Sequence, residues 1–437
     1  TPSASAEATT PSASAEATTP SASAEGITLD QLNAQTLVID TRDWSFGPKY
    51  KTPVFEFRTP GDMPAGTYLL GTLDKVEGDI SDILIEGITG KRFYLQHEDG
   101  RLYLVLEDMR EATTVTWNGT ADSNVWDLAE TANFLNGEES VYAAQGDDIL
   151  FDDNAATGNV TVKGAVSPNS ITFDNSKLAY TLTGDSILGG GTITKNGTAR
   201  VTINTENRTG ATVINAGTLS VNALANLTGI TYGALGDVNQ KITINDGATL
   251  SVSQPVITDQ PFAVTGNATL DVPTNITFTL NKGLKGTGST VTKTSAGTLT
   301  LGTQNTFSQL TIKAGRVNAI ATNYVDQLPA TVEFQGGTLW AANDESNNIT
   351  NNADIVVPKG KTGTLYAGYR STYRGSLNGE GTINVYTGGI RCYFDGDWSE
   401  FAGTIKAYKE NRQNKKSYDP IWAFRNDNGL PNAKLDV

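Results

Sequence analysis

The sequence predicts an all-β protein, a right-handed parallel β-helix (solenoid) that follows a small β domain and a disordered repeat tail. The first observation behind this prediction is an internal repeat, because residues 188–221 recur in residues 286–319 at an offset of 98 without a gap. The second is that short Thr/Val/Ile/Leu strands alternate with Gly or Asn turns within and beyond both copies. One such unit cannot bury its own apolar face, so neighbouring units must stack into a solenoid.

The composition agrees with an elongated solenoid and excludes several classes of partner. The 437 residues are too many for one compact core, whereas the core of a solenoid grows with its length. The net charge of −15 disfavours duplex nucleic acid and anionic membrane surfaces, since both require a basic footprint. A single Cys excludes an internal disulfide framework. No apolar stretch reaches roughly 18 residues, so we expect this segment not to span a membrane as a helix.

Residues 1–25 repeat a nine-residue unit, TPSASAEAT, that contains no large apolar side chain. Such a segment cannot offset the entropy of ordering, so it is predicted to be a disordered linker, with a glycosylated Ser/Thr stalk as the alternative. The chain opens at Thr1 without a Met, and we interpret it as a fragment of a larger, processed protein.

Residues 26–110 have a different sequence pattern, with longer apolar strands separated by turn signals. The last two strands lie in RFYLQHEDGRLYLVL, which predicts a hairpin around Glu98-Asp99-Gly100. We therefore predict either a small β domain or the end of an upstream β-helix. Either would cover strand edges that the first coil of the solenoid leaves open.

The region 111–437 begins with denser sequence blocks that precede the repeats. The blocks are Trp117-Asn118-Gly119, Trp126, Asn133-Phe134, Gly146-Asp147-Asp148, Phe151-Asp152-Asp153 and residues 168–176. Together with the two repeat copies, they resemble the autotransporter-associated β-strand repeat, also called the passenger-associated transport repeat, of Bacteroidetes type. The resemblance implies a right-handed parallel β-helix exposed on the bacterial cell or released from it.

The repeats also predict this fold on physical grounds. Inward positions alternate along each strand, and the turns between faces require a positive φ, which Gly and Asn tolerate best. The Asn-x-Gly triplets at 215–217 and 245–247 satisfy that requirement. The acidic cluster at 146–153 has the oxygen density of a Ca²⁺ site but no Gly between its Asp pairs, so we interpret it as a solvated turn flank.

No catalytic signature is present in the sequence. One His and one Cys cannot form a zinc set, and His97 has no G-x-S-x-G partner. The Gly-rich LGGGT at Leu188 precedes a strand rather than a helix, so it predicts a turn and not a phosphate loop. We therefore expect a non-enzymatic protein without a cofactor. A β-helical polysaccharide lyase or hydrolase that uses paired carboxylates is the alternative.

The last third of the chain is rich in aromatic and basic residues. Fourteen aromatics lie between Phe334 and Phe424, against four between residues 201 and 320. Rings beside Arg suit sugar stacking and protein hot spots alike, whereas a wider core filled by these rings is the alternative. The candidate ligand-binding residues are Trp340, Tyr366, Tyr369, Arg370, Tyr373, Arg391 and Trp398.

These observations together predict a cell-surface or secreted β-helical scaffold or adhesin of bacterial origin. Its expected partners are glycans or surface proteins of the host or of other bacteria. The alternative is a carbohydrate-binding accessory segment of a glycan-degrading protein. If the chain binds a ligand directly, we expect the contact between residues 340 and 422, where rigid rings bury area at low entropic cost.

Overall fold

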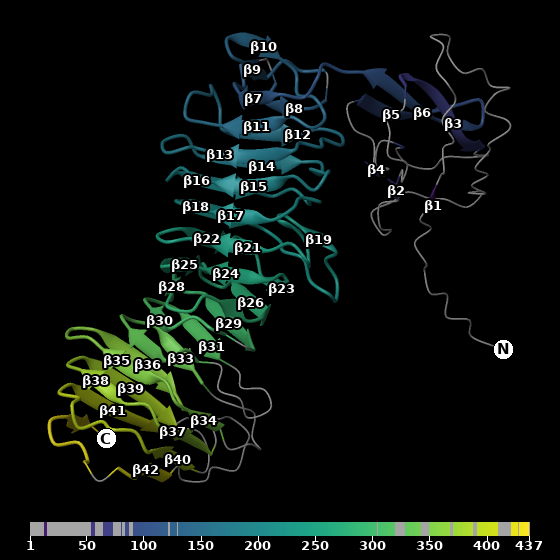
Figure 1. The fold of residues 1–437 in the computed structure, drawn as a ribbon. Coiled ribbons are helices and arrows are strands. Elements are labelled where there is room, and N and C mark those ends of the chain that lie inside the picture. Colours follow the sequence, from purple (N-terminus) through teal and green to yellow (C-terminus); the bar gives the residue numbers. More distant parts are fainter. Residues whose placement is uncertain are drawn as a thin grey trace, which may run out of the picture. The chain divides into compact units, whose positions relative to one another are not determined.

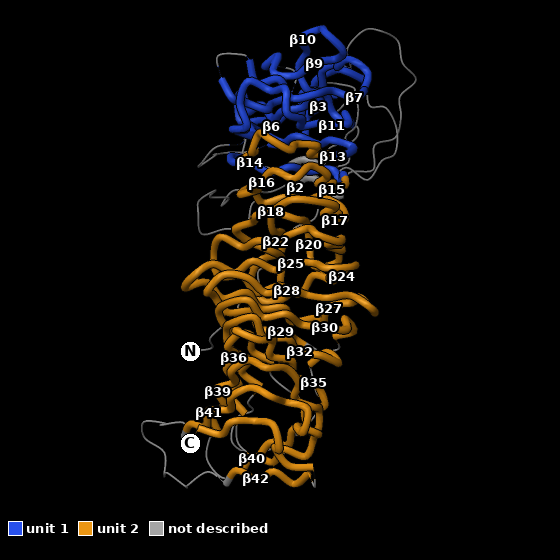
Figure 2. The backbone as a smooth tube through the Cα atoms, turned by 90° about the vertical axis from the view of Figure 1, so that its left-hand side faces the viewer, with its two compact units in different colours: residues 1–171, 183–191 blue, residues 172–182, 192–437 orange. Residues whose placement is uncertain are grey.

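The computed structural model describes residues 13–14, 54–56, 64–72, 80, 84–86, 91–120, 123–128, 130–303, 305–319, 328–341, 349–367, 370–387, 391–409, 421–426 and 428–436. These residues form strands and turns without an α-helix, and none of their segments is a helix long and apolar enough to cross a membrane. The predicted disordered linker lies outside the described residues except for Ala13–Ser14. Figure 2 shows two compact units, residues 1–171 with 183–191 and residues 172–182 with 192–437.

The first unit contains a small antiparallel sheet in the order β3 (Gly66–Thr72), β6 (Arg101–Asp108) and β5 (Lys91–Glu98). The predicted hairpin is confirmed as β5 and β6. Asp99 and Gly100 at its turn have φ values of 50° and 72°, as a type I′ turn requires. A separate parallel sheet has the order β1 (Ala13–Ser14), β2 (Val54–Glu56) and β4 (Leu84–Glu86).

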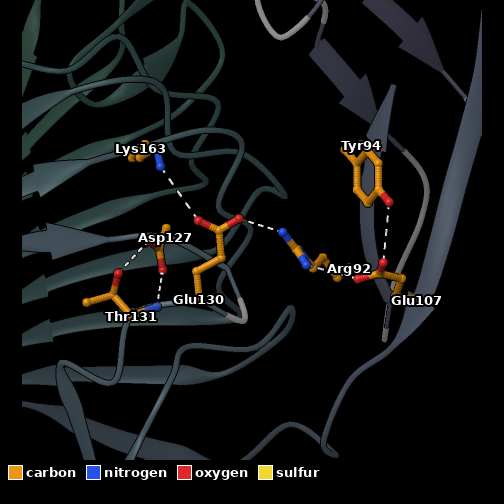
Figure 3. Close-up of polar contacts among 7 residues, drawn as sticks. All are labelled: Arg92, Tyr94, Glu107, Asp127, Glu130, Thr131 and Lys163. Atoms are coloured by element: carbon orange, nitrogen blue, oxygen red, sulfur yellow. Dashed lines mark hydrogen bonds and ion pairs between the residues drawn. The ribbon is translucent and has the colours of Figure 1, made fainter. Parts of the chain in front are cut away.

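A chain of alternating charges links β5 to the coils of the first unit (Figure 3). Arg92 lies 3.0 Å from Glu107 of β6 and 2.5 Å from Glu130, and Glu130 lies 3.6 Å from Lys163. Beside Glu130, Asp127 accepts bonds from the backbone N–H and the hydroxyl of Thr131. All these ion pairs are partly exposed, so each contributes little to stability.

The first coils of this unit are packed around four aromatic rings, and their strands begin the solenoid. Trp117, Trp126, Phe134 and Phe151 are at most 1% exposed, with centroid separations of 5.2 to 6.1 Å between neighbouring rings. The sequence blocks that precede the repeats therefore supply the core of the first coils. The strands are β7 (Thr114–Trp117), β8 (Val125–Trp126), β9 (Phe134–Asn136), β10 (Glu139–Val141), β11 (Asp148–Phe151) and β12 (Asn159–Val162). Here β11 pairs with β7 and β12 with β8 in parallel, whereas β9 is antiparallel to β7 and β10.

The boundary between the units passes through β13 (Ser170–Phe173) and β14 (Tyr180–Gly184). The rest of the second unit is a stack of parallel strands in four sheets, shown in Figure 1. In this unit the first sheet has the order β15 (Thr192–Lys195), β17 (Thr212–Ile214), β21 (Ile242–Ile244), β24 (Phe262–Val264) and β27 (Leu284–Lys285). The second sheet continues from β14 through β16 (Arg200–Ile203), β18 (Thr218–Val221), β22 (Thr249–Val252), β25 (Asn267–Asp271), β28 (Thr290–Thr294), β30 (Gln309–Ile312), β32 (Thr331–Phe334), β35 (Asp354–Val357) and β38 (Leu377–Gly379).

The other two sheets lie in the C-terminal part of the second unit. The third sheet has the order β23 (Val256–Thr258), β26 (Thr277–Lys282), β29 (Thr298–Thr303), β31 (Arg316–Ala319), β33 (Thr338–Trp340), β36 (Thr362–Tyr366), β39 (Thr382–Thr387), β41 (Thr404–Lys409) and β43 (Lys434–Asp436). The fourth has the order β34 (Ile349–Asn351), β37 (Ser371–Tyr373), β40 (Arg391–Phe394) and β42 (Ile421–Phe424). A short hairpin of β19 (Tyr232–Gly233) and β20 (Gly236–Asp237) interrupts the stack. The predicted all-β parallel β-helix with a small preceding β sheet is confirmed.

Every second side chain of these strands points into the coil, as the alternation in the sequence predicts. In the second sheet, Val201, Leu219, Leu250 and Leu270 follow one another in register and are fully buried. These four successive coils thus add to one apolar column. Burial at roughly 25 cal/mol per Å² of apolar surface is the main force that holds such a stack together.

Candidate functional site

Four aromatic side chains form a ladder on the outward side of the third sheet. Trp340, Tyr366, Tyr386 and Tyr408 occupy matching positions of β33, β36, β39 and β41. Their ring centroids are 4.5, 4.7 and 4.7 Å apart, with interplanar angles of 25°, 14° and 14°. The rings are outward because the adjacent strand positions, such as Leu339, are buried. We call these four residues the aromatic ladder.

The ladder begins beside a cation. The guanidinium of Arg316 lies 4.1 Å from the centroid of the Trp340 ring, within the range of a cation–π interaction. Arg316 also donates from Nε to Oδ1 of Asn318 at 2.5 Å, and Asn318 donates to the hydroxyl of Thr300 at 3.2 Å. This polar network orients Arg316 over the indole.

The stacking decides what the ladder can bind. A sugar ring stacks on an aromatic face, but here the faces of neighbouring rings cover one another. The ring edges lie toward the outside, and Tyr408 is 38% exposed. The sequence predicted that Trp340 and Tyr366 provide ring faces for sugar stacking. In the structure these two rings present their edges instead.

A second outward group lies on the fourth sheet, and we call it the arginine face. It consists of Arg370, Arg374, Arg391, Tyr393, Asp395 and Arg425. The Arg425 guanidinium lies 3.8 Å from the centroid of the Tyr393 ring and donates two hydrogen bonds of 2.7 Å to the Asp395 carboxylate. Arg391 lies 5.7 Å from the same ring centroid. Arg370 and Arg374 flank β37, Arg391 begins β40 and Arg425 directly follows β42 in the same sheet.

Two of the predicted binding residues belong to the core instead. Tyr373 and Trp398 are 2% and 1% exposed. Both contact the buried ring of Phe394, at centroid distances of 5.7 and 4.6 Å. For these two rings the alternative of a wider, aromatic core is correct, and a direct ligand contact is not.

The remaining predicted residues divide between the two outward groups. Trp340 and Tyr366 lie in the aromatic ladder, and Arg391 lies in the arginine face at the start of β40. Arg370 is half-buried just before β37, with a φ of 48° in the left-handed region. Tyr369 lies outside the described residues. The ladder and the arginine face are thus two surfaces, where the sequence suggested one.

Several outward residues were missed as site candidates, among them Tyr386, Tyr408, Tyr393 and Arg425. A signal for the ladder exists in the sequence. Residues 340, 366, 386 and 408 are separated by 26, 20 and 22 positions, which is the length of one coil. Aromatic residues repeated at the coil length predict a ladder, because in-register positions stack.

The acidic cluster at 146–153 has a structural role. The sequence predicted only a solvated turn flank here. Asp147 is fully buried and accepts two hydrogen bonds from the Arg110 guanidinium, at 2.9 and 2.5 Å. It also accepts from the backbone N–H groups of Thr113 and Ala144. This carboxylate therefore holds the start of the solenoid, and its neighbour Asp148 accepts bonds from Asn169 and Ser170.

The described residues offer little reactive chemistry. No group of three or more His, Cys, Asp or Glu side chains among them is arranged to hold a metal ion. Cys392 is fully buried, and burial raises the pKa of its thiol to about 12, so it is a poor nucleophile.

Comparisons with known proteins add no further identification: no family model, no curated protein and no solved structure matches the chain.

Proposed function

We propose that this protein is a non-enzymatic bacterial scaffold, displayed at the cell surface or secreted, that adheres through the outward faces of its C-terminal coils. The observation that carries the proposal is the aromatic ladder. Four large side chains lie in register on the outside of a solenoid whose interior already has a continuous apolar core. The resemblance of the sequence blocks to autotransporter-associated repeats supports the bacterial surface as the location.

The ladder is suited to adhesion because it is rigid and amphipathic. Stacked rings keep few rotamers in the free protein, so binding orders little that is not already ordered. Tyrosine hydroxyls add hydrogen bonds at the ring edges, and Tyr, Trp and Arg are the residues most enriched at binding hot spots. The ladder supplies three Tyr and one Trp, and Arg316 lies beside it.

A triple substitution tests the proposal without removing the stack. Beads coated with the chain are applied to a panel of bacterial and epithelial cells, with Tyr366→Phe, Tyr386→Phe and Tyr408→Phe combined in one variant. We expect adhesion to fall roughly tenfold, because the variant loses the ladder's hydroxyl groups while its rings remain. The thermal unfolding midpoint should not change by more than a few degrees.

A matched control replaces three outward threonines of β26 and β29 in the third sheet's preceding coils, at Thr277, Thr279 and Thr298, with Val. It also removes hydroxyl groups from outward strand positions, and we expect it to adhere like the wild type. If the tyrosine variant keeps its fold and adheres as strongly as the wild type, the ladder is not the adhesive surface. Release of reducing or unsaturated ends from polysaccharides by the wild type would contradict a non-enzymatic role.

A further inference from the structure

The outward side of the second sheet carries a row of threonines. Five consecutive strands, β18, β22, β25, β28 and β30 (Figure 1), each place one Thr in register with the next. The residues are Thr218, Thr249, Thr269, Thr292 and Thr311, and we call them the threonine row. They are outward because the adjacent positions, such as Leu250 and Leu270, are buried. Since the register does not shift, neighbouring members are about 4.8 Å apart, the separation of paired strands.

Four hydroxyl groups of the row are free to bind. The side chains of Thr218, Thr249, Thr269 and Thr292 are half-buried, and their hydroxyls make no hydrogen bond within the part of the chain that the structure describes. None of these oxygens is a buried polar atom without a partner, so each one reaches solvent. The fifth member, Thr311, is 5% exposed and accepts a hydrogen bond from Gln309 at 3.2 Å.

The row itself is uncharged. Arg200 precedes it in the strand register and Glu333 follows it, so charges stand at its two ends. Among the positions two residues before or after each member, the charged ones are Asp271 and Lys313. Three hydroxyls already donate to the Asp271 carboxylate, those of Ser251, Thr294 and Ser295 at 2.9, 2.9 and 2.6 Å. A neutral partner therefore fits this face better than an ion does.

The chemistry of the row also favours a partner that is already ordered. A neutral hydroxyl exchanges one hydrogen bond with water for another, so each contact gains only about 1 kcal/mol. A flexible sugar chain would lose that gain in the entropy of ordering its own units. A rigid lattice that repeats at the strand spacing meets every hydroxyl at once, and the small contributions then add. The threonines are rigid as well, because β-branched side chains are restricted at χ1.

We infer that the threonine row is an ice-binding surface. Ice presents a rigid lattice of water oxygens that both donate and accept hydrogen bonds, and its surface repeat is close to the separation of β-strands. In this arrangement the free hydroxyls of the row take the places of water oxygens in the outermost ice layer. The inference goes beyond adhesion and does not depend on it, since the aromatic ladder lies on the third sheet and the threonine row on the second.

Ice growth in a solution of the full chain tests the inference. One readout is the gap between the temperatures at which a single ice crystal melts and grows again, and the other is attachment of the fluorescently labelled chain to that crystal. Thr269→Lys places a long charged side chain in the middle of the row, and Thr249→Lys is a second variant one coil away. The matched control is Thr279→Lys, at a half-buried outward position of β26 in the third sheet.

We expect the wild type and Thr279→Lys to coat ice and to open a temperature gap. Both row variants should lose the gap and the coating, because the lysine keeps the ice layer away from the remaining hydroxyls and its charge would be desolvated against ice. The unfolding midpoint of each variant should stay within a few degrees of the wild type, which shows that the loss is not unfolding.

Three results would overturn the inference. The first is a wild type that neither coats ice nor opens a gap, and the second is an equal loss in Thr279→Lys and in the row variants. The third is attachment of the wild type to microcrystalline cellulose but not to ice, with Thr269→Lys abolishing it, which would assign the row to a solid polysaccharide. Adhesion to cells through the ladder is unaffected by any of these results.

Discussion

Two lysine side chains occupy inward positions of the coils, where neighbouring strands carry aliphatic residues. Lys195 is in register with Ile214, and Lys293 with Leu270 and Ile312. Both are fully buried. Nζ of Lys293 donates to the carbonyl groups of Thr294, Ser295 and Ala314 at 2.6, 2.7 and 3.3 Å. Nζ of Lys195 donates in the same way to the carbonyl of Gly197. Lys195 and Lys293 are 98 positions apart, in the two copies of the repeat. In each copy the buried ammonium group therefore binds carbonyl groups of the turn that follows its strand.

Lys293 gives stability a specific dependence on pH. Burial lowers its pKa from 10.5 to about 8, partly opposed by Asp271. Between these two pH values the unfolded chain binds more protons than the folded chain, so this residue adds stability as pH rises and loses it as pH falls through 8. We expect the urea midpoint of the wild type, relative to Lys293→Met, to increase from pH 7.5 to pH 9.5. A constant difference between the two proteins would contradict a lowered pKa.

Asp147 is the residue whose loss should weaken the start of the solenoid most directly. Its carboxylate is buried and paired with Arg110, and removing one partner of such a pair costs about 3 kcal/mol or more. We expect Asp147→Asn to lower the free energy of unfolding, measured for the first transition in guanidinium, by that amount. The exposed Glu138→Gln makes the same chemical change and should leave the transition within about 0.5 kcal/mol of the wild type. Equal effects of the two substitutions would show that the ion pair is unimportant.

At the scale of the element, the two copies of the repeat form the same strands on different faces. Residues 192–221 alternate between the first and second sheets as β15, β16, β17 and β18. The matching residues 290–319 alternate between the second and third sheets as β28, β29, β30 and β31. The repeat therefore encodes a strand, a turn and a second strand, but not the sheet that each strand joins.

The Asn-x-Gly turns divide two tasks between their residues. Gly217 and Gly247 have φ values of 67° and 75°, so the glycines supply the left-handed backbone as predicted. Asn215 and Asn245 contribute through their side chains instead. Asn245 donates to Asn215 at 2.6 Å, and Asn215 donates to Asn196 at 2.7 Å. The asparagines thus form an amide ladder that links the turns of successive coils.

The two glycines provide a matched pair of substitutions. A Cβ at Gly247 meets nothing within 4 Å, so Gly247→Ala should cost about 1 kcal/mol for the left-handed backbone alone. A Cβ at Gly217 would lie 2.6 Å from the carbonyl oxygens of Gly197 and Thr198 in the adjacent coil. We expect Gly217→Ala to be more destabilising than Gly247→Ala by about 1 to 3 kcal/mol in chemical denaturation. The reverse order would mean that the coils separate easily at this turn.

On the scale of the whole molecule, the sequence predicts the class of fold better than the outward surface. Period-two alternation and repeated turns specify stacked parallel strands, and the Asp99-Gly100 pair specifies the hairpin before them. The side on which an aromatic residue lies depends on the phase of each strand, and every turn resets that phase. Tyr386 and Tyr393 lie an odd number of positions apart, on β39 and β40, and yet both are outward. Composition alone assigned Tyr366 and Tyr373 to one binding surface, although Tyr366 is outward and Tyr373 is inward.

The architecture also predicts how far the effect of a mutation extends. Each coil of a solenoid contacts only its neighbours, so its stability is approximately a sum of local terms and nearest-neighbour terms. Opening of one group of coils should therefore leave distant coils protected. Hydrogen exchange measured on Asp147→Asn and on Lys293→Met can separate these groups.

For Asp147→Asn we expect faster exchange in β7, β11 and β12, with wild-type rates in β30, β32 and β35. For Lys293→Met the pattern should reverse, with faster exchange in β25, β28 and β30 and no change in β7 and β11. The double variant should show the sum of both patterns, because sites that share no partner add independently. Faster exchange throughout the described strands in either single variant would mean that the chain opens as one cooperative body, and the nearest-neighbour description would then be wrong.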